Sequence, residues 1–161
     1  MYLVDDAQET LETLRLQYEI HPEIAVVGMA DDSELAWEAM AARRPDIVSI
    51  DIELGTDSGF DLCRRIAGKM PDVFVVMCSV DADEERKREA ARAGAHWFLA
   101  KPVSYADIRR LLEVVRERRE GGGLEQAGLT PEADAQKADL TDGAEEGWPN
   151  DILGAVMRRI L

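Results

Sequence analysis

Apolar and polar positions along residues 1–119 alternate between a strand pattern and a helix pattern. Short apolar runs predict strands at residues 2–4, 24–30, 46–51, 72–79 and 96–100. Apolar residues three or four positions apart predict helices at residues 7–20, 31–44, 58–70, 82–94 and 104–119. Regular alternation of strands and helices predicts an α/β fold, in which a doubly wound parallel sheet carries helices on both faces.

The residues at the helix ends support these boundaries. Asp32 and Ser33 lie where an N-cap is expected for the second helix, and Ser104 does so for the last one. Gly94 is expected to end the fourth helix, because glycine adopts the left-handed conformation found at many helix C-termini.

The composition changes after residue 119. Residues 120–147 are rich in Gly, Ala and acids and predict a flexible acidic linker. Residues 148–161 predict a short amphipathic helix, with its apolar stripe formed by Ile152, Leu153, Val156, Met157, Ile160 and Leu161. This C-terminal tail has three interpretations, in decreasing order of preference: a helix that docks on this domain or a neighbour, the first helix of an output domain, or an unstructured end.

The net charge of −14 comes from 19 basic and 33 acidic residues. It argues against direct nucleic-acid binding and against an anionic membrane surface as partner, because both need clustered Lys and Arg. No apolar run approaches the roughly 20 residues that span a bilayer. The first residues, MYLVDD, lack the basic-then-apolar layout of a signal peptide, so we expect a cytoplasmic protein.

Cysteine and histidine spacing offers no metal or redox motif. Cys63 and Cys78 lie within apolar segments and are expected to be buried, reduced thiols. His21 and His96 are far apart in sequence, and we expect both on the surface.

Acidic residues occur where predicted strands end. The first strand runs into Asp5 and Asp6, the third ends at Asp51, the fourth ends at Ser79 and the fifth is followed by Lys101. Ligands of open α/β sheets bind beyond the carboxyl ends of the strands. If the first and third strands are neighbours, three carboxylates converge there, and a hard divalent cation such as Mg²⁺ would relieve their repulsion.

Asp51 is then a candidate nucleophile beside a cation. It could attack a phosphoryl donor and form an aspartyl-phosphate, with Lys101 and the Ser79 hydroxyl binding the phosphoryl oxygens. Each residue alone is an ordinary turn or loop residue. Together, placed at strand ends in one alternating pattern, they favour phosphoryl chemistry.

The segments YLVDD, PDIVSIDIELGTDSGFDL, VVMCS and AGAHWFLAKP, with the spacing between them, resemble the receiver domain of two-component response regulators. The resemblance covers residues 1–119. It implies a flavodoxin-like (βα)5 fold with a five-stranded parallel sheet in the order 2-1-3-4-5. It also implies phosphotransfer from a histidine kinase, or a phosphotransfer protein, to Asp51.

The resemblance also assigns roles to individual residues. It places Mg²⁺ on Asp5, Asp6, Asp51 and the backbone carbonyl of Glu53. Phosphoryl binding is implied for Ser79 and for Lys101, which precedes a cis proline. The conformational switch is implied for Ser79 and Phe98.

Three positions depart from the usual pattern of this family. Gly55 stands where Pro is common and leaves the turn after Asp51 less rigid. Glu53 adds an acidic side chain near the reaction site, and Val80 puts a branched side chain after Ser79. We expect these changes to affect rates more than mechanism. Trp97 should face away from its neighbour Phe98, because alternate residues of a strand point to opposite faces.

The resemblance implies signalling rather than metabolic catalysis. The expected partners are a sensor histidine kinase or phosphotransfer protein and a downstream target or output domain. A homodimer could form through the fourth helix, fifth strand and fifth helix, or through the C-terminal helix. Two alternatives stay open: a Mg²⁺-dependent phosphatase or phosphotransferase, for which Glu53 has the spacing of a second acid, and a phosphorylation-independent interaction module.

Overall fold

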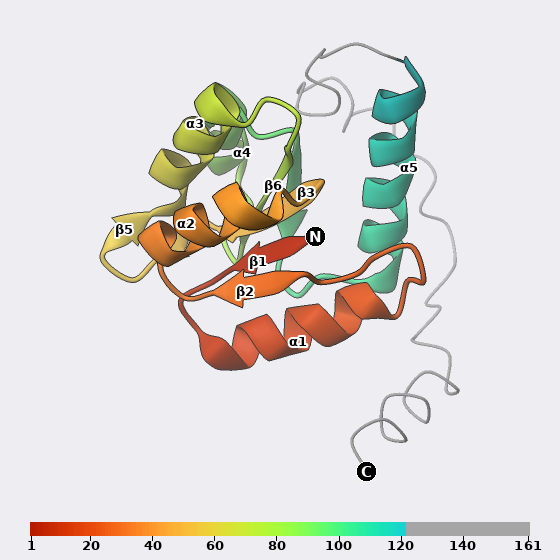
Figure 1. Cartoon of the computed structure of the whole chain (residues 1–161), viewed down its shortest axis with the longest axis horizontal. Helices are drawn as coiled ribbons and strands as arrows, with labels where there is room; N and C mark the ends of the chain where they lie inside the picture. Colours follow the sequence, from red (N-terminus) through yellow and green to blue (C-terminus); the bar gives the residue numbers. More distant parts are fainter. Residues whose placement is uncertain (122–161) are drawn as a thin grey trace. The chain divides into compact units, whose positions relative to one another are not determined.

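The computed structural model describes residues 1–121, which form a parallel sheet between two layers of helices (Figure 1). The five strands of this sheet follow the order β2-β1-β3-β6-β7. Their bounds are β1 Tyr2–Val4, β2 Gly28–Ala30, β3 Ile47–Asp51, β6 Phe74–Ser79 and β7 Trp97–Ala100. The predicted parallel sheet and its 2-1-3-4-5 order are confirmed, since β4 and β5 belong to a separate hairpin.

Each sheet strand is followed by a helix, as the hydrophobic pattern predicts. The helices are α1 Gln8–Glu19, α2 Ser33–Arg43, α3 Gly59–Lys69, α4 Glu84–Ala93 and α5 Tyr105–Gly121. Residues 122–161, which contain most of the predicted linker and the whole predicted C-terminal helix, lie outside the described part of the chain. Within residues 1–121, no helix is both long and apolar enough to cross a membrane.

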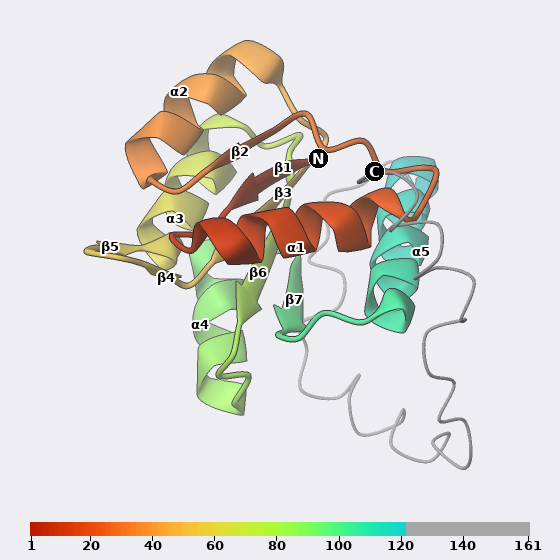
Figure 2. The same cartoon turned by 90° about the horizontal axis from the view of Figure 1, so that it is seen from below.

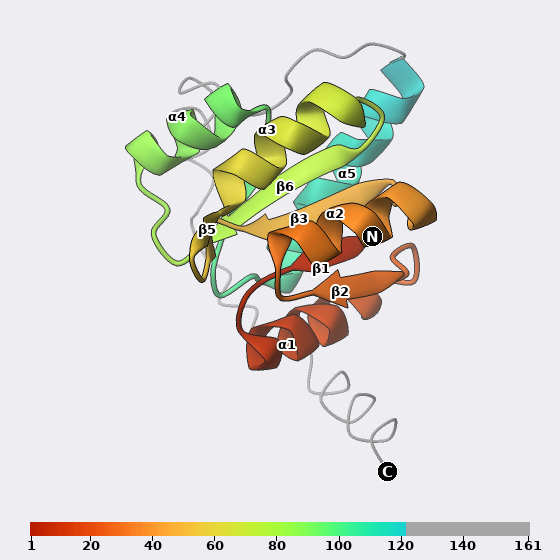
Figure 3. The same ribbon diagram turned by 60° about the vertical axis from the view of Figure 1, so that its left-hand side comes forward.

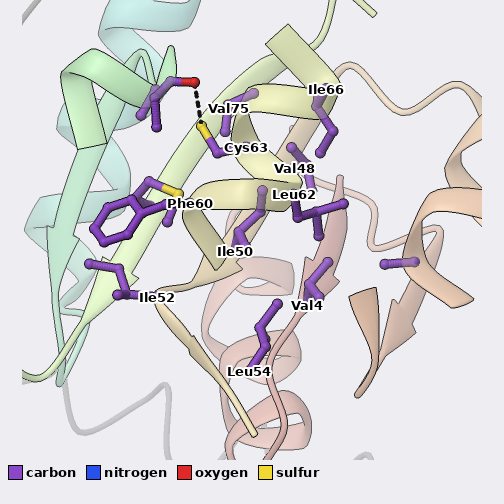
Figure 4. Close-up of a cluster of buried hydrophobic side chains, with 14 of the residues drawn as sticks. Val4, Val48, Ile50, Ile52, Leu54, Phe60, Leu62, Cys63, Ile66 and Val75 are labelled. Atoms are coloured by element: carbon purple, nitrogen blue, oxygen red, sulfur yellow. Dashed lines mark hydrogen bonds between the residues drawn. The ribbon is translucent and has the colours of Figure 1, made fainter. Parts of the chain in front are cut away.

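The core consists of two apolar layers, one on each face of the sheet. Helices α2, α3 and α4 cover one face, whereas α1 and α5 cover the other (Figure 2). Alternate residues of β3 divide between the layers. Val48 and Ile50 pack under α3 (Figure 4). Ile47 packs in the layer that α1 and α5 cover. Because both faces are covered, β3 and β6 are apolar along nearly their whole length.

The same alternation places the aromatic pair of β7. Phe98 packs against the layer under α2, α3 and α4, whereas Trp97 packs against the layer under α1 and α5. The prediction that these neighbours face opposite ways is therefore confirmed.

The helix caps form as the sequence predicts. The Asp32 carboxylate accepts hydrogen bonds from the backbone N–H groups of Glu34 and Leu35, both at 2.9 Å. Gly94 ends α4 with a φ of 97°. At the start of α5, the Ser104 hydroxyl accepts from the Asp107 N–H, and the Asp107 carboxylate accepts in return from the Ser104 N–H. These bonds satisfy N–H groups that the first helical turn leaves without partners.

The second strand is shorter than predicted. The apolar run 24–30 forms a strand only at Gly28–Ala30, because β1 begins at Tyr2 and offers no ladder beyond that point. Residues before Gly28 are held instead by Met1, whose amino group donates to the Ala25 carbonyl at 2.7 Å and whose carbonyl accepts from the Val27 N–H at 2.8 Å.

A hairpin between β3 and α3 was not predicted from the pattern. Its strands β4 (Glu53–Leu54) and β5 (Asp57–Ser58) are two residues each and pair antiparallel. The turn passes through Gly55, whose φ is 62°. Leu54 anchors the hairpin in the core with 4% of its surface exposed (Figure 4).

Both cysteines are buried, as expected. The Cys63 thiol donates to the Ala93 carbonyl at 3.4 Å, and the Cys78 sulfur lies 3.1 Å from the Ser49 hydroxyl. Burial raises the pKa of the Cys63 thiol to about 12 and the pKa of Cys78 to about 11. Both groups therefore stay protonated at neutral pH.

The expectation of two surface histidines is wrong. His21 is buried, with 4% of its surface exposed, and its ring stacks on Tyr105 with centroids 4.3 Å apart. His96 is half-buried, and its Nδ1 accepts a hydrogen bond from the Val75 N–H at 2.9 Å. The Val75 carbonyl accepts from the His96 N–H at 2.8 Å, so the imidazole extends the ladder between β6 and β7 by one rung.

This contact predicts a loss of stability in acid. Burial, and secondarily Arg118, lower the pKa of His96 from 6.5 to about 4. The unfolded chain therefore takes up this proton near pH 6.5, whereas the native protein takes it up near pH 4. The contribution of His96 to stability is fully present above the unfolded pKa and is lost as the pH falls through this window.

We expect the urea midpoint of the wild type to fall more between pH 6.5 and pH 4 than that of His96→Asn. The Asn amide oxygen can still accept from Val75, but it does not titrate. If the urea midpoints of the two proteins fall equally between pH 6.5 and pH 4, protonation of His96 does not contribute to the loss of stability in acid.

Candidate functional site

Three carboxylates meet at the carboxyl edge of the sheet. β1 and β3 pair in parallel with Val4 opposite Ile50, so Asp5 and Asp51 follow side by side. Carboxylate oxygens of Asp5, Asp6 and Asp51 all lie within 4.8 Å of one another. Asp5 is buried, Asp51 is half-buried and Asp6 is exposed, so the cluster opens toward solvent on the side of Asp6.

Lys101 places an ammonium group between two of these acids. Its Nζ donates to Asp5 Oδ2 at 2.6 Å and to Asp51 Oδ2 at 2.7 Å. The lysine follows β7, which pairs with β6 so that the Lys101 N–H donates to the Ser79 carbonyl at 2.8 Å. The peptide bond from Lys101 to Pro102 is cis, as the resemblance implied.

Burial and charge act against each other in this cluster. Burial raises the pKa of Asp51 above its ordinary value, the hydrogen bond and charge of Lys101 lower it, and the charge of Asp5 raises it again. Burial alone would lower the pKa of Lys101, but its hydrogen bonds to Asp5 and Asp51 raise that pKa. The Lys101 ammonium thus offsets the charge of two poorly solvated carboxylates, Asp5 and Asp51, and Asp6 lies beside them.

The donor set fits a hard divalent cation. Mg²⁺ binds carboxylate and carbonyl oxygens together with water, and the three acids offer oxygen atoms in one cluster with an open side. Asp5, Asp6 and Asp51 are the residues that would hold the ion. The backbone carbonyl of Glu53, predicted as a further ligand, stays a prediction.

The other predicted site residues surround the cluster at different depths. Ser79 ends β6, is 6% exposed, and accepts a hydrogen bond from the Asp81 N–H through its hydroxyl at 3.1 Å. Phe98, three positions before Lys101, is half-buried against the α4 side of the sheet. The Glu53 side chain is 81% exposed and lies outside the acidic cluster, 3.8 Å from Arg86 of α4.

Sequence reasoning missed two residues that shape the site. Gly59 opens α3 so close to the end of β3 that an added Cβ would lie 1.9 Å from the Asp51 carbonyl oxygen. Ser33 of α2 donates a hydrogen bond to Asp57 of the hairpin at 2.5 Å. A glycine at the start of a predicted helix could have pointed to the close approach at Gly59. Nothing in the sequence indicated the contact between Ser33 and Asp57.

A model of the response regulator receiver domain matches residues 1–113, which is more than half of the chain. The chain belongs to this family. The curated relatives of this receiver include the DNA-binding transcriptional activator DevR/DosR of Mycobacterium tuberculosis, which is 29% identical over 115 residues. That match covers 71% of this chain and 53% of the relative.

A second relative is protein-glutamate methylesterase/protein-glutamine glutaminase 2 of Cereibacter sphaeroides, with 31% identity over 155 residues. The match covers 95% of this chain and 42% of that enzyme. The chain thus spans about half the length, or less, of these curated relatives.

Solved structures agree with the fold. The receiver domain of a modulated diguanylate cyclase from Desulfovibrio desulfuricans G20 superposes with a TM-score of 0.66 at 28% identity, covering 76% of this chain and 96% of that one. A CheY-like receiver domain protein from Methanospirillum hungatei JF-1 gives a TM-score of 0.66 at 21% identity, covering 74% and 95%.

Proposed function

We propose that this receiver accepts a phosphoryl group on Asp51 from a histidine kinase or phosphotransfer protein, with Mg²⁺ bound at the acidic cluster. One observation carries the proposal: Lys101 bridges Asp5 and Asp51 beside a third acid, at the edge of the sheet where α/β proteins bind ligands. Carboxylates that share a site repel one another, and a bound divalent cation would offset that repulsion.

Phosphoryl transfer replaces the P–N bond of the donor with an O–P bond to Asp51. A carboxylate oxygen of Asp51 attacks phosphorus, an O–P bond forms, and the P–N bond to the donor imidazole breaks. The electron pair of that bond leaves with the imidazole, which takes a proton from water. Water later attacks the acyl-phosphate, and inorganic phosphate and the Asp51 carboxylate are released.

The residues around Asp51 contribute charge and position. Bound Mg²⁺ would neutralise negative charge on the phosphoryl oxygens. Lys101 already donates to Asp51 and can donate to a phosphoryl oxygen after transfer. The Ser79 hydroxyl lies at the end of the neighbouring strand, and we propose that it turns from the Asp81 N–H to the phosphoryl group, with Phe98 moving inward after it.

The acidic cluster is open to a donor on the side of Asp6, which is exposed. A hollow of about 430 Å³ lies beside Lys101, lined by Val80, Pro102 and residues of α1. Val80 is 82% exposed beside this hollow.

We propose a cytoplasmic signalling role in which phosphorylation alters a surface read by a protein target or an output domain. A homodimer through α4, β7 and α5 is one form that this surface could take. The alternative of a phosphatase is less well supported, because the Glu53 carboxylate would have to protonate a leaving group yet is exposed and faces Arg86.

The proposal is tested by incubating the protein with acetyl phosphate and Mg²⁺ and measuring its intact mass. We expect one added phosphoryl group on the wild type, none on Asp51→Ala, and none when a chelator removes Mg²⁺. A folded wild type that gains no mass, or an Asp51→Ala variant that gains as much, would contradict the proposal.

A further inference from the structure

The β4–β5 hairpin forms one wall of the acidic cluster. It follows Asp51 directly, and it closes through a hydrogen bond of 2.8 Å from the Gly59 N–H to the Ile52 carbonyl. Its turn approaches the outermost acid, because a Cβ on Gly55 would lie 3.9 Å from Asp6 Oδ2. Movement of the hairpin would therefore change the side of the cluster that opens to solvent.

The hairpin has little stiffness of its own. Strands of two residues are too short to be stable alone, and Gly55 at a φ of 62° leaves the turn with wide conformational freedom. Leu54 fixes the first strand in the core, but the second strand carries only Asp57, which is exposed, and Ser58. A side-chain contact from a neighbouring element is what can hold the second strand.

Helices α2 and α4 flank the hairpin (Figure 3). A side chain of α2 contacts the second strand, and a side chain of α4 contacts the first strand. On α2, the Ser33 hydroxyl donates to Asp57 Oδ2 at 2.5 Å, in an exposed hydrogen bond to a carboxylate. On α4, Arg86 lies 3.8 Å from Glu53, an exposed ion pair of long distance that contributes little. The contact from Ser33 is the shorter of the two, and it is the one that reaches the second strand.

Helix α2, which carries Ser33, is held in place by several contacts. Its N-terminus is capped by Asp32, its buried face packs through Ala36 and Met40, and its Glu34 accepts from Arg65 of α3 at 2.5 Å. Ser33 is the first residue of this fixed helix, so its hydroxyl has a defined place beside the hairpin.

We propose that Ser33 is a positioning residue for the cation site: it holds the hairpin, and so the backbone of Glu53, against the acidic cluster. The inference rests on the proposed function, because it concerns the affinity of the same site for Mg²⁺. It assigns a role in that affinity to a helix that contributes no carboxylate to the cluster.

The test compares the wild type with four variants by calorimetric titration with Mg²⁺. Ser33→Ala removes the donor, Ser33→Thr retains a hydroxyl, and Asp57→Asn retains an acceptor while removing its charge. Ser58→Ala is the matched control. It makes the same chemical change in the same hairpin, and the Ser58 hydroxyl caps nothing in the described structure. Amide hydrogen exchange of residues 53–59 in the metal-free proteins gives a second readout.

We expect Ser33→Ala to bind Mg²⁺ about threefold to tenfold more weakly than the wild type, the range for loss of one hydrogen bond. Ser33→Thr should restore binding, and Ser58→Ala should match the wild type. Exchange of the hairpin amides should be faster in Ser33→Ala, with unchanged exchange in the sheet.

The outcomes separate the two proposals. If the wild type binds Mg²⁺ and Ser33→Ala binds it equally well, the positioning role is overturned and the proposed function stands. If the folded wild type binds no Mg²⁺, both are overturned. Equal weakening in Ser33→Ala and Ser58→Ala would also overturn the positioning role, because it would reflect a general loosening of the hairpin.

Discussion

Lys101→Met is expected to lower the free energy of unfolding of the metal-free protein by about 2 to 4 kcal/mol at neutral pH. The ammonium is the shared hydrogen-bond donor of Asp5 and Asp51, whose side chains are 2% and 14% exposed. Removing one partner of a buried ion pair leaves the other charge poorly solvated, which destabilises more than the intact pair stabilises. Water can solvate these carboxylates on the exposed side of Asp6. The expected loss of stability therefore stays below the roughly 5 kcal/mol that breaking a fully buried ion pair can cost.

Urea denaturation of the wild type and the variant measures this loss. Lys69→Met is the matched control, because Lys69 is exposed at the end of α3, and we expect a change within about 0.5 kcal/mol. Adding Asp51→Asn to Lys101→Met should recover part of the stability, since it removes one of the two uncompensated charges. Saturating Mg²⁺ should do the same by replacing the ammonium. A Lys101→Met protein as stable as Lys69→Met would refute the argument.

The sequence predicts most of the fold and the convergence of the acids, and the reason is physical. A strand covered on both faces carries apolar residues on both of them, so β3 and β6 are recognisable as short apolar runs. Once the first and third strands are neighbours, parallel pairing brings Asp5 and Asp51 together without further information. The resemblance to receivers supplied the strand order that this step needs.

Features that depend on pairing partners could not be predicted. Residues 24–27 read as strand, but whether they join a ladder depends on where β1 begins. The hairpin strands carry no apolar run, so no periodicity indicates them. His96 opens the predicted strand 96–100 and reads as a surface histidine, and only the register of β6 and β7 reveals that its Nδ1 accepts from the Val75 N–H.

Replacing glycine by alanine is expected to change the stability in opposite directions at two positions of α3, Gly68 and Gly59. Gly68 is exposed, and a Cβ there would meet nothing within 4 Å. We use Gly68→Ala as the control, and it should stabilise the protein by about 0.5 to 1 kcal/mol, because alanine loses less backbone entropy in a helix.

Gly59→Ala is expected to destabilise the protein by about 3 kcal/mol and to block phosphorylation of Asp51. The new Cβ would lie 1.9 Å from the Asp51 carbonyl oxygen, 2.9 Å from its carbon and 3.0 Å from the Ile52 Cα. All three are backbone atoms, so no side chain can rotate away, and the strand end that carries Asp51 must move. Urea midpoints and intact mass after acetyl phosphate treatment measure both effects. A Gly59→Ala protein that gains stability as Gly68→Ala does would mean that the close approach of α3 to β3 does not constrain the site.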